Sequence, residues 1–313
     1  MQCIRYSRFG GPEVLELHEV ELPEPGPGQV RLRVAGAGVN PIDCKTRAGL
    51  GFAAQALGTQ FQFTPGYDVA GMVDATGAGV TEPALGDAVF GMVNFPLQAG
   101  AYAEFVVLAA ADVVPAPARL PLAHAAGLPL AGLTAWHALF DVGQLQAGER
   151  VLVLAGAGGV GHLATQLACW KGATVSATAS AANRDFLLRH GVDQPLDYTE
   201  PSWQQAGPWD LILDLMGGSA GVMALSLLAP GGRLVTVPTN TAAQLLQAGA
   251  EQGCTVLPMR VNPDAGQLRQ LATLVDAGIL KLHVSASFAL RDAAAAHRQI
   301  ETGRTRGKII LVP

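Results

Sequence analysis

The sequence predicts an α/β protein in which a β-rich part is followed by a doubly wound parallel sheet. Its 313 residues, half of them apolar and 14% charged, are enough to bury two cores. Near residue 125 the pattern changes from short, interrupted apolar runs to continuous apolar runs separated by helical stretches. A G-x-G-x-x-G sequence directly follows the first of the continuous runs, which is typical of this fold class.

The first 120 residues have the pattern of β-strands. From Val30, "VRLRVAGAGV" alternates polar and apolar residues, as a half-buried strand does. Three shorter apolar runs follow, "DVAGMVDATG", "DAVFGMV" and "AYAEFVVL", and glycine and proline interrupt the chain between them. This part is therefore predicted to be an all-β or barrel-like domain.

The second part contains six short apolar runs separated by helical stretches. They begin at Val151, Thr174, Gln194, Asp210, Gly232 and Cys254. Because strands covered on both faces are continuously apolar, these runs predict a six-stranded parallel sheet. The stretch "AGQLRQLATLVDAGIL" is predicted to be a helix, and the last run, "GKIILVP", an edge strand that rejoins the first domain.

Composition excludes several classes of protein. The net charge of -5 and the lack of a basic run give no reason to expect nucleic-acid binding. The four cysteines are far apart in the sequence, which predicts neither a disulfide framework nor a zinc knuckle and favours the reducing cytoplasm. The stretch from Leu120 to Phe140 lacks Asp, Glu, Lys and Arg, but its two prolines and two histidines favour burial in protein over a membrane span.

The glycine loop predicts a binding site for a dinucleotide. Gly156 allows a tight turn, Gly158 allows close approach of the backbone to a pyrophosphate, and Gly161 allows the helix to pack on the strand. Gly159 and Val160 lie where the helix begins, so their N–H groups are available to phosphates. The alternative is a structural turn without a ligand.

The end of the second apolar run indicates which dinucleotide binds. NAD-selective folds place an Asp or Glu there to bind the ribose 2′-hydroxyl, whereas this run ends at Ala179 and Ser180 with no acid. Ser180 offers a hydroxyl and Arg184 a cation to a 2′-phosphate, which favours NADPH. The alternative is that Ser180 caps the next helix and Arg184 is a solvated surface residue.

Several segments together are similar to one known family. They are "GERVLVLAGAGGVGHLATQLA", "LPLAGLTAWHAL", "GAYAEFVV", "PGYDVAGMV", "NRDFLLRHGVDQPLDY" and "RGKIILV". With them the chain resembles the zinc-independent quinone oxidoreductases of the medium-chain dehydrogenase/reductase superfamily, although Cys169 stands where a basic residue or serine is usual.

The resemblance implies a fold, a cofactor and further site residues. It implies a GroES-like catalytic domain made of residues 1–124 and 285–313, a Rossmann domain made of residues 125–284, bound NADPH and a homodimer. It places Thr134 beside the nicotinamide, and Tyr198 with Ser180 and Arg184 at the 2′-phosphate. For Tyr198, packing against the edge of the sheet is the alternative.

The segments that resemble zinc-dependent relatives lack their ligand pattern. Tyr67 stands where those relatives have a histidine, and Cys44 lies a few residues beyond the position of their zinc cysteine, without a partner. A catalytic zinc needs about three protein ligands, so we expect no metal here. Cys44 is instead expected to be a small packed thiol.

Without a metal, conjugated acceptors are the favoured substrates. Hydride addition to a quinone or enone spreads the charge over several atoms, so a few hydrogen-bond donors suffice. Asn40, Tyr67 and Lys45 are the candidate donors, with an Asn-Pro turn, packing and a surface location as their respective alternatives. Asp68 is expected to anchor the fold. The stretch from Leu50 to Phe63 is expected to border the pocket of a small-molecule acceptor.

Two other functions are consistent with parts of the sequence. "GGSAG" matches the G-x-S-x-G of hydrolases, with Ser219 followed in order by Asp276 and His297. An NADPH-binding protein with little or no reductase turnover is the second alternative, since a fold does not by itself imply an activity.

Overall fold

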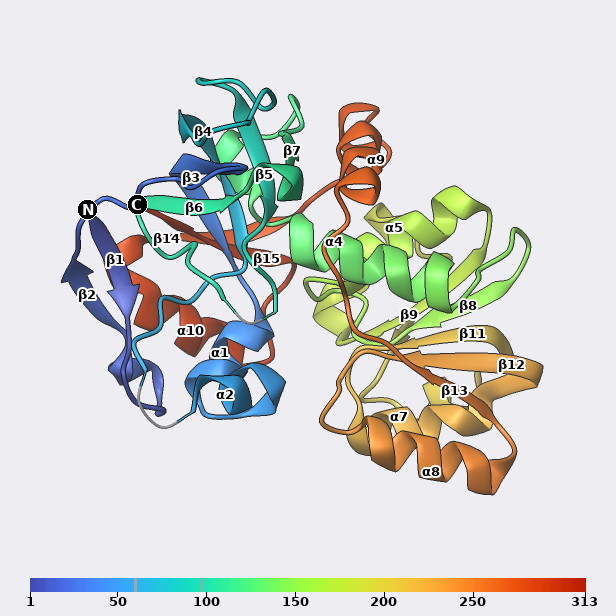
Figure 1. The fold of residues 1–313 in the computed structure, drawn as a ribbon. Helices are drawn as coiled ribbons and strands as arrows, with labels where there is room; N and C mark the ends of the chain where they lie inside the picture. Colours follow the sequence, from blue (N-terminus) through green and yellow to red (C-terminus); the bar gives the residue numbers. More distant parts are fainter. Residues whose placement is uncertain (59–60, 97) are drawn as a thin grey trace. The chain divides into compact units, whose positions relative to one another are not determined.

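The computed structural model describes residues 1–58, 61–96 and 98–313 (Figure 1). Residues 59 and 60, within the stretch expected to border the substrate pocket, lie outside the described residues. Contacts between residues divide the chain into two compact units. The first unit comprises residues 1–133, 262–278 and 282–313, and the second unit comprises residues 134–261 and 279–281. Residues 125–133, 262–278 and 282–284, which lie within the predicted Rossmann domain, pack with the first unit.

The first unit is built on a mixed, mainly antiparallel sheet in the order β14-β15-β3-β4-β5-β7, with β6 also paired to β3. Its strands are β3 (Gln29–Val39), β4 (Asp68–Thr76), β5 (Ala88–Met92), β6 (Phe105–Ala109), β7 (Val113–Pro115), β14 (Val284–Ala289) and β15 (Lys308–Val312). A separate antiparallel pair consists of β1 (Gln2–Arg5) and β2 (Glu16–Glu19). The apolar runs of the first 120 residues thus form the strands predicted for them.

The last strand joins the first unit, as predicted, but it is not an edge strand. β15 pairs antiparallel with β3, and β14 pairs parallel with its other side. Ile309, Ile310 and Leu311 are all fully buried. A strand covered on both faces has no polar alternation, and this explains why the four residues after Lys308 are all apolar.

β3 is also buried more completely than its sequence predicts. Between Val34 and Val39 most of its residues are buried, so the half-buried strand expected from the alternating pattern is wrong for this half. Even Arg31 is only 9% exposed, because its guanidinium pairs with Asp74 at 2.7 Å and Glu24 at 3.0 Å. β3 lies in the middle of the sheet, with a neighbouring strand on each side. The side chains of such a central strand are buried more completely than the alternation of polar and apolar residues predicts.

Among the residues that the structure describes, six helices and three short 3₁₀ turns accompany the first sheet. The helices are α1 (Pro41–Arg47), α2 (Gly51–Leu57), α3 (Leu122–Ala125), α4 (Pro129–Trp136), α9 (Ala265–Asp276) and α10 (Ala293–Glu301). The turns are η1 (Pro12–Val14), η2 (Ala110–Asp112) and η7 (Leu290–Asp292). α9 confirms the predicted helix. Residues of β3, β4, β15 and α10 share one apolar core.

The second unit contains the predicted six-stranded parallel sheet, in the order β10-β9-β8-β11-β12-β13. Its strands are β8 (Arg150–Val153), β9 (Thr174–Ala179), β10 (Gln194–Asp197), β11 (Trp209–Asp214), β12 (Leu228–Thr236) and β13 (Thr255–Pro258). Numbered along the chain, this is the 3-2-1-4-5-6 order of a doubly wound fold, in which the order reverses between β8 and β11. Ligands of such sheets bind at the carboxyl ends of the strands near that reversal.

Helices cover both faces of the second sheet (Figure 1). They are α5 (Gly161–Lys171), α6 (Arg184–Arg189), α7 (Gly218–Ala224) and α8 (Ala242–Gln252), with the π-helix η3 (His137–Val142) and the 3₁₀ turns η4 (Ala181–Asn183), η5 (Pro201–Gln205) and η6 (Leu225–Leu227). Within the described part of the chain, no helix has the length and apolar character needed to cross a membrane.

Candidate cofactor and active site

The glycine loop connects β8 to α5 in the second unit, and two of its glycines are required by packing. A Cβ on Gly156 would lie 2.6 Å from the Cβ of Ala177 on β9, and one on Gly161 would lie 2.3 Å from the carbonyl oxygen of Ala155. These contacts are closer than any side chain tolerates. Gly156 and Gly161 therefore let the loop and the helix lie against the sheet.

Gly158 is different, because the protein itself hardly restricts it. A Cβ at this position would meet only the carbonyl oxygen of Ala155, at 3.3 Å. The backbone around Gly158 is half-exposed. A glycine that internal packing does not require is the one expected where a ligand approaches the backbone closely.

The loop also presents hydrogen-bond donors that the protein leaves free. The N–H groups of Gly159, Val160 and Gly161 donate to no other residue that the structure describes. They are consecutive and lie at the start of α5, which is 11 residues long. Free N–H groups at a helix N-terminus, together with the helix dipole, form a site for phosphate.

One residue that sequence reasoning missed supports the loop. His162 is fully buried, and its Nδ1 lies 2.9 Å from the carbonyl oxygen of Gly158. A carbonyl can only accept, so Nδ1 carries the proton and donates. The histidine thus fixes the peptide between Gly158 and Gly159, which carries the first of the free N–H groups. The feature of the sequence that points to this role is the position of His162, directly after the third glycine of the G-x-G-x-x-G motif.

The residues predicted to bind the 2′-phosphate lie at the ends of two neighbouring strands. Ser180 follows β9, and its hydroxyl accepts from the side-chain amide of Asn183 at 3.2 Å rather than capping the next helix. Arg184 begins α6 and is exposed, and no ion pair of its guanidinium occurs among the described residues. Tyr198 follows β10, is 57% exposed, and donates its N–H to the carbonyl of Ala179 at 3.2 Å.

A carboxylate that sequence reasoning missed lies at the same place. Asp197 ends β10 and is in register with Ala179 at the end of β9. Its Oδ1 accepts from the N–H of Thr199 at 2.9 Å and from its hydroxyl at 2.7 Å. These hydrogen bonds lower the pKa of Asp197, so it is ionised at neutral pH. β9 itself ends without an acidic residue, whereas the neighbouring strand β10 ends with Asp197.

In the first unit, Asn40 is the N-cap of α1 and is buried with its side chain fully engaged. Its Nδ2 donates to Asp68 Oδ2 at 2.8 Å and lies 3.4 Å from the carbonyl of Gly38. Its Oδ1 accepts from the ammonium of Lys308. These contacts fix the orientation of the side-chain amide of Asn40. Both hydrogens on Nδ2 then point at acceptors of the protein itself.

Lys308 and Asp68 form a buried ion pair around Asn40. Their charged atoms lie 3.7 Å apart, and Lys308 also donates to the carbonyl of Val39 at 3.1 Å. Asp68 Oδ1 accepts from the N–H of Leu130, at the start of α4, at 2.7 Å. Burial raises the pKa of Asp68 and lowers that of Lys308, while each charge opposes the shift of the other. Asp68 thus anchors several segments, the role expected for it.

Tyr67 and Lys45 have contrasting surroundings. Tyr67 is fully buried, its hydroxyl donates to the carbonyl of Pro96 at 3.1 Å, and its ring packs edge-on against Phe95. Burial raises the pKa of its phenol. Lys45 is exposed on α1, and its ammonium has no hydrogen bond or ion pair within the described part of the chain. Of the three candidate donors, Lys45 is the one whose hydrogens are not already used.

Lys45 borders an apolar hollow of about 230 Å³ on the first unit. The hollow is lined by Pro41, Cys44, Lys45, Ala48, Leu50, Ile300 and Glu301. Cys44 is 5% exposed, and burial raises the pKa of its thiol. The thiol is therefore protonated and packed, as expected.

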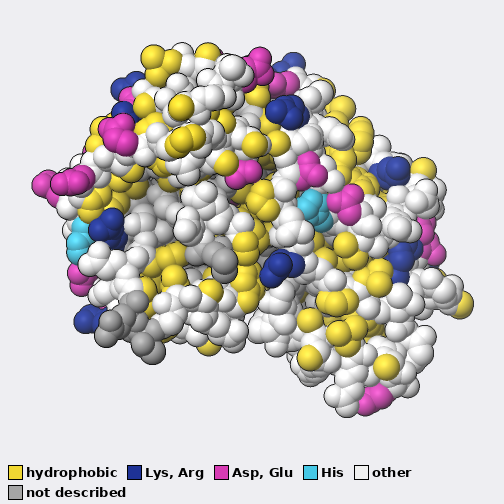
Figure 2. All heavy atoms as spheres, in the orientation of Figure 1, with side chains coloured by type: hydrophobic (Ala, Val, Ile, Leu, Met, Phe, Trp, Pro, Cys, Tyr) yellow, Lys and Arg dark blue, Asp and Glu magenta, His cyan; other side chains and the backbone are white. Residues whose placement is uncertain are grey.

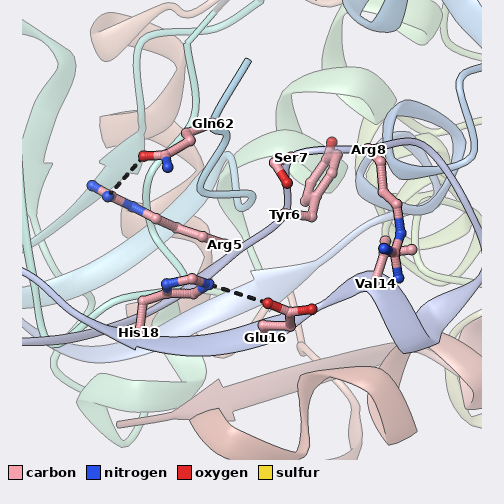
Figure 3. Close-up of a pocket in the computed structure, with 8 residues that line it drawn as sticks. All are labelled: Arg5, Tyr6, Ser7, Arg8, Val14, Glu16, His18 and Gln62. Carbon is pink, nitrogen blue, oxygen red and sulfur yellow. Dashed lines mark hydrogen bonds and ion pairs between the residues drawn. The ribbon is translucent and has the colours of Figure 1, made fainter. Parts of the chain in front are cut away.

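Other features of the surface do not resemble a binding site. A hollow of about 60 Å³ near β1 and β2 contains Arg5, Arg8 and His18, but Glu16 lies 3.5 Å from His18 within it (Figure 3). On the face shown in Figure 2, lysine and arginine side chains are scattered rather than gathered. Among the described residues, no group of three or more His, Cys, Asp or Glu is arranged to hold a metal ion.

Two further residues named from the sequence can be placed. Thr134 lies on α4 and is 2% exposed. Ser219, the nucleophile of the hydrolase alternative, lies on α7. Its predicted base, His297, has both ring nitrogens within hydrogen-bond distance of other side chains in the first unit, which disfavours that alternative.

The fold and the glycine loop together define a class: two-domain oxidoreductases that use a nicotinamide dinucleotide. Family comparison agrees. The model for the alcohol dehydrogenase GroES-like domain matches residues 26–118, and that for a zinc-binding dehydrogenase matches residues 190–311.

Comparison with individual proteins narrows the class. Quinone oxidoreductase of Rattus norvegicus is 32% identical over all of this chain and 98% of its own length. The structure of the quinone oxidoreductase from Coxiella burnetii has a TM-score of 0.96 at 37% identity, covering 100% of this chain and 99% of that one. A mycobacterial protein complexed with NADPH has a TM-score of 0.85 at 29% identity, with both chains covered completely.

The chain therefore belongs to the quinone oxidoreductase group of the medium-chain dehydrogenase/reductase superfamily. It is an NAD(P)H-dependent oxidoreductase with the GroES-like and parallel-sheet domains of that superfamily.

Proposed function

We propose that this protein is an NADPH-dependent, zinc-independent oxidoreductase that transfers hydride to a quinone or an α,β-unsaturated carbonyl. The observation that carries the proposal is the glycine loop, where three consecutive N–H groups have no partner among the described residues and Gly158 is open to close approach. These features fit a pyrophosphate. NADPH, when bound, supplies the hydride; the protein supplies placement and hydrogen bonds.

The proposed preference for NADPH depends on the ends of β9 and β10. The exposed guanidinium of Arg184, the hydroxyl of Ser180 and the phenol of Tyr198 offer donors to a 2′-phosphate. Asp197 opposes it with one negative charge. We therefore propose a moderate preference for NADPH rather than exclusion of NADH.

On the acceptor side, Lys45 is proposed to contact the substrate. Its ammonium has no partner in the described part of the chain and lies beside an apolar hollow, so it is suited to donate to the oxygen of an apolar quinone or enone as negative charge develops there. Asn40 and Tyr67 hold the surrounding backbone through the contacts described above. The proposal includes no metal, because the described residues offer no set of three ligands.

The test is an assay of NADPH oxidation, followed by absorbance, with a benzoquinone, a naphthoquinone and a short enone as acceptors. The proposal predicts turnover with at least one of them, a lower rate with NADH, and no loss after treatment with a chelator. NADPH binding without turnover of any acceptor would favour the alternative, a cofactor-binding protein with little reductase activity.

Variants test the acceptor side. Lys45→Met is expected to lower kcat about tenfold, the value of one charge-assisted hydrogen bond, with NADPH affinity unchanged. Lys45→Arg, which keeps the charge, is the matched control. Asn40→Ala and Tyr67→Phe are also expected to lower turnover more than cofactor affinity. If none of the three positions affects turnover, the placement of the active site is wrong.

The small-molecule acceptor, the homodimer and the cytoplasmic location expected from the sequence are part of the same proposal. Size-exclusion chromatography with light scattering tests the dimer.

A further inference from the structure

A chain of buried polar side chains connects α10, near the end of the sequence, to α1. Its members are Asp43 and Arg47 on α1, Tyr102 in the loop before β6, and His297 on α10. None of them is more than 2% exposed. The site described above does not use Tyr102 or His297, yet burying four such groups together is costly unless each is hydrogen-bonded.

The direction of each hydrogen bond in this chain follows from chemistry. Arg47 can only donate, and its Nη1 lies 3.1 Å from Nδ1 of His297, so Nδ1 accepts. Burial and Arg47 lower the pKa of His297 to about 3, so the ring is neutral and carries its hydrogen on Nε2. Nε2 then donates to the hydroxyl of Tyr102 at 3.1 Å, and Tyr102 donates to Asp43 Oδ2 at 3.3 Å.

Asp43 connects these buried hydrogen bonds to the start of α1. Its Oδ2 accepts the N–H of Asn40 at 2.9 Å, and its Oδ1 accepts the N–H of Gly66 at 3.3 Å. An acid at the third position of a helix that bonds the N-cap N–H is half of a capping box. Asp43 therefore fixes the first turn of the helix.

Arg47 holds the other end of α1. It donates to the carboxylate of Glu301 on α10 and, through Nε, to the carbonyl of Gly10 at 3.1 Å. A helix of seven residues is too short to be stable by itself, so its position depends on such contacts. Through its two ring nitrogens, His297 is linked to the last turn by Arg47 and to the first turn by Tyr102 and Asp43.

We propose that His297 and Tyr102 are positioning residues, which hold both turns of α1 in place and so fix Lys45 for the reaction. The effect on catalysis rests on the proposed function, whereas the effect on α1 does not. Neither residue needs to touch the substrate.

The first experiment measures amide hydrogen exchange in α1. Tyr102→Phe and His297→Leu are expected to raise exchange across residues 40–47 about tenfold, the loss of one buried hydrogen bond. His297→Gln, which can accept from Arg47 and donate to Tyr102, is expected to stay close to the parent protein. Exchange in α5 of the second unit serves as the internal reference. Unchanged exchange in α1, or a rise of the same size in α5, would overturn the proposal.

The second experiment measures kcat and NADPH affinity for the same three variants. Tyr102→Phe and His297→Leu are expected to lower kcat about fivefold to tenfold with the Kd for NADPH unchanged, and His297→Gln is expected to restore kcat. Loosening of α1 with an unchanged kcat would overturn the catalytic role. If the parent protein turns over no acceptor, the proposed function fails, and the exchange experiment still decides whether these residues position α1.

Discussion

Replacing His297 by glutamine should change how the stability of the first unit depends on pH. In the folded protein, burial of the ring and the nearby charge of Arg47 lower the pKa of His297 to about 3. A histidine in an unfolded chain has a pKa of about 6.5. As pH falls below 6.5, the unfolded chain therefore takes up a proton that the folded protein does not. The stability that His297 contributes is present above pH 6.5 and is lost as pH falls from 6.5 toward 3.

The size of the effect follows from this difference in pKa. Each pH unit within the window corresponds to about 1.4 kcal/mol, so the free energy of unfolding of the parent should fall by about 2 kcal/mol between pH 7.5 and 5.0 through this one group. Glutamine does not titrate. Relative to the parent, His297→Gln should become more stable by the same amount over this range, while Asp43, Tyr102, Arg47 and Glu301 remain present in both proteins.

Urea unfolding at several pH values measures the effect. Circular dichroism follows both units, whereas all four tryptophans, residues 136, 170, 203 and 209, lie in the second unit. If the units unfold separately, the difference in stability between His297→Gln and the parent should appear in circular dichroism and be absent from tryptophan fluorescence. His18→Gln is the control, because His18 has a 42% exposed side chain on β2. If the free energy of unfolding changed with pH by the same amount in the parent and in His297→Gln, the reasoning would be refuted.

Three other substitutions give sharp outcomes. Gly158→Ala should leave the melting temperature within about 2 °C, because its Cβ meets only one atom at 3.3 Å, and should weaken NADPH binding about tenfold or more; unchanged affinity would argue against a pyrophosphate here. Asp197→Asn should tighten NADPH binding about threefold to tenfold by removing one repulsive charge and leave NADH binding unchanged, as paired titrations would reveal. Lys308→Met should lower the free energy of unfolding by about 3 kcal/mol or more, because Asp68 is left buried and unpaired; adding Asp68→Asn should recover part of that loss in urea titrations, and no recovery would contradict the pairing.

The fold could be predicted well from the sequence because its strongest signals are local. The six apolar runs of the second unit became six parallel strands, since strands covered on both faces must be apolar along their whole length. The glycine loop was equally clear, because Gly161 is required by contacts within one strand–loop–helix unit and Gly156 by a contact with the adjacent strand β9.

What could not be predicted depends on contacts between distant segments. β14 covers the side of β15 that was expected to be free. Asp197 lies beside Ala179 only because β10 pairs with β9, so an inspection of the end of β9 alone could not find it. The bonds of Asn40 to Asp68 and Lys308 join residues far apart in the sequence. They give its amide a role that the local Asn-Pro pattern does not reveal.

The central claim is that the end of β9, beside the glycine loop, accepts the 2′-phosphate of NADPH. Titration calorimetry of the purified protein with NADPH and NADH tests it most directly, alongside Arg184→Ala and the control Arg189→Ala on the same helix. The account predicts that NADPH binds about tenfold more tightly than NADH, that Arg184→Ala removes this difference, and that Arg189→Ala keeps it. Equal affinity for the two cofactors in the parent protein, or no binding of either, would contradict it.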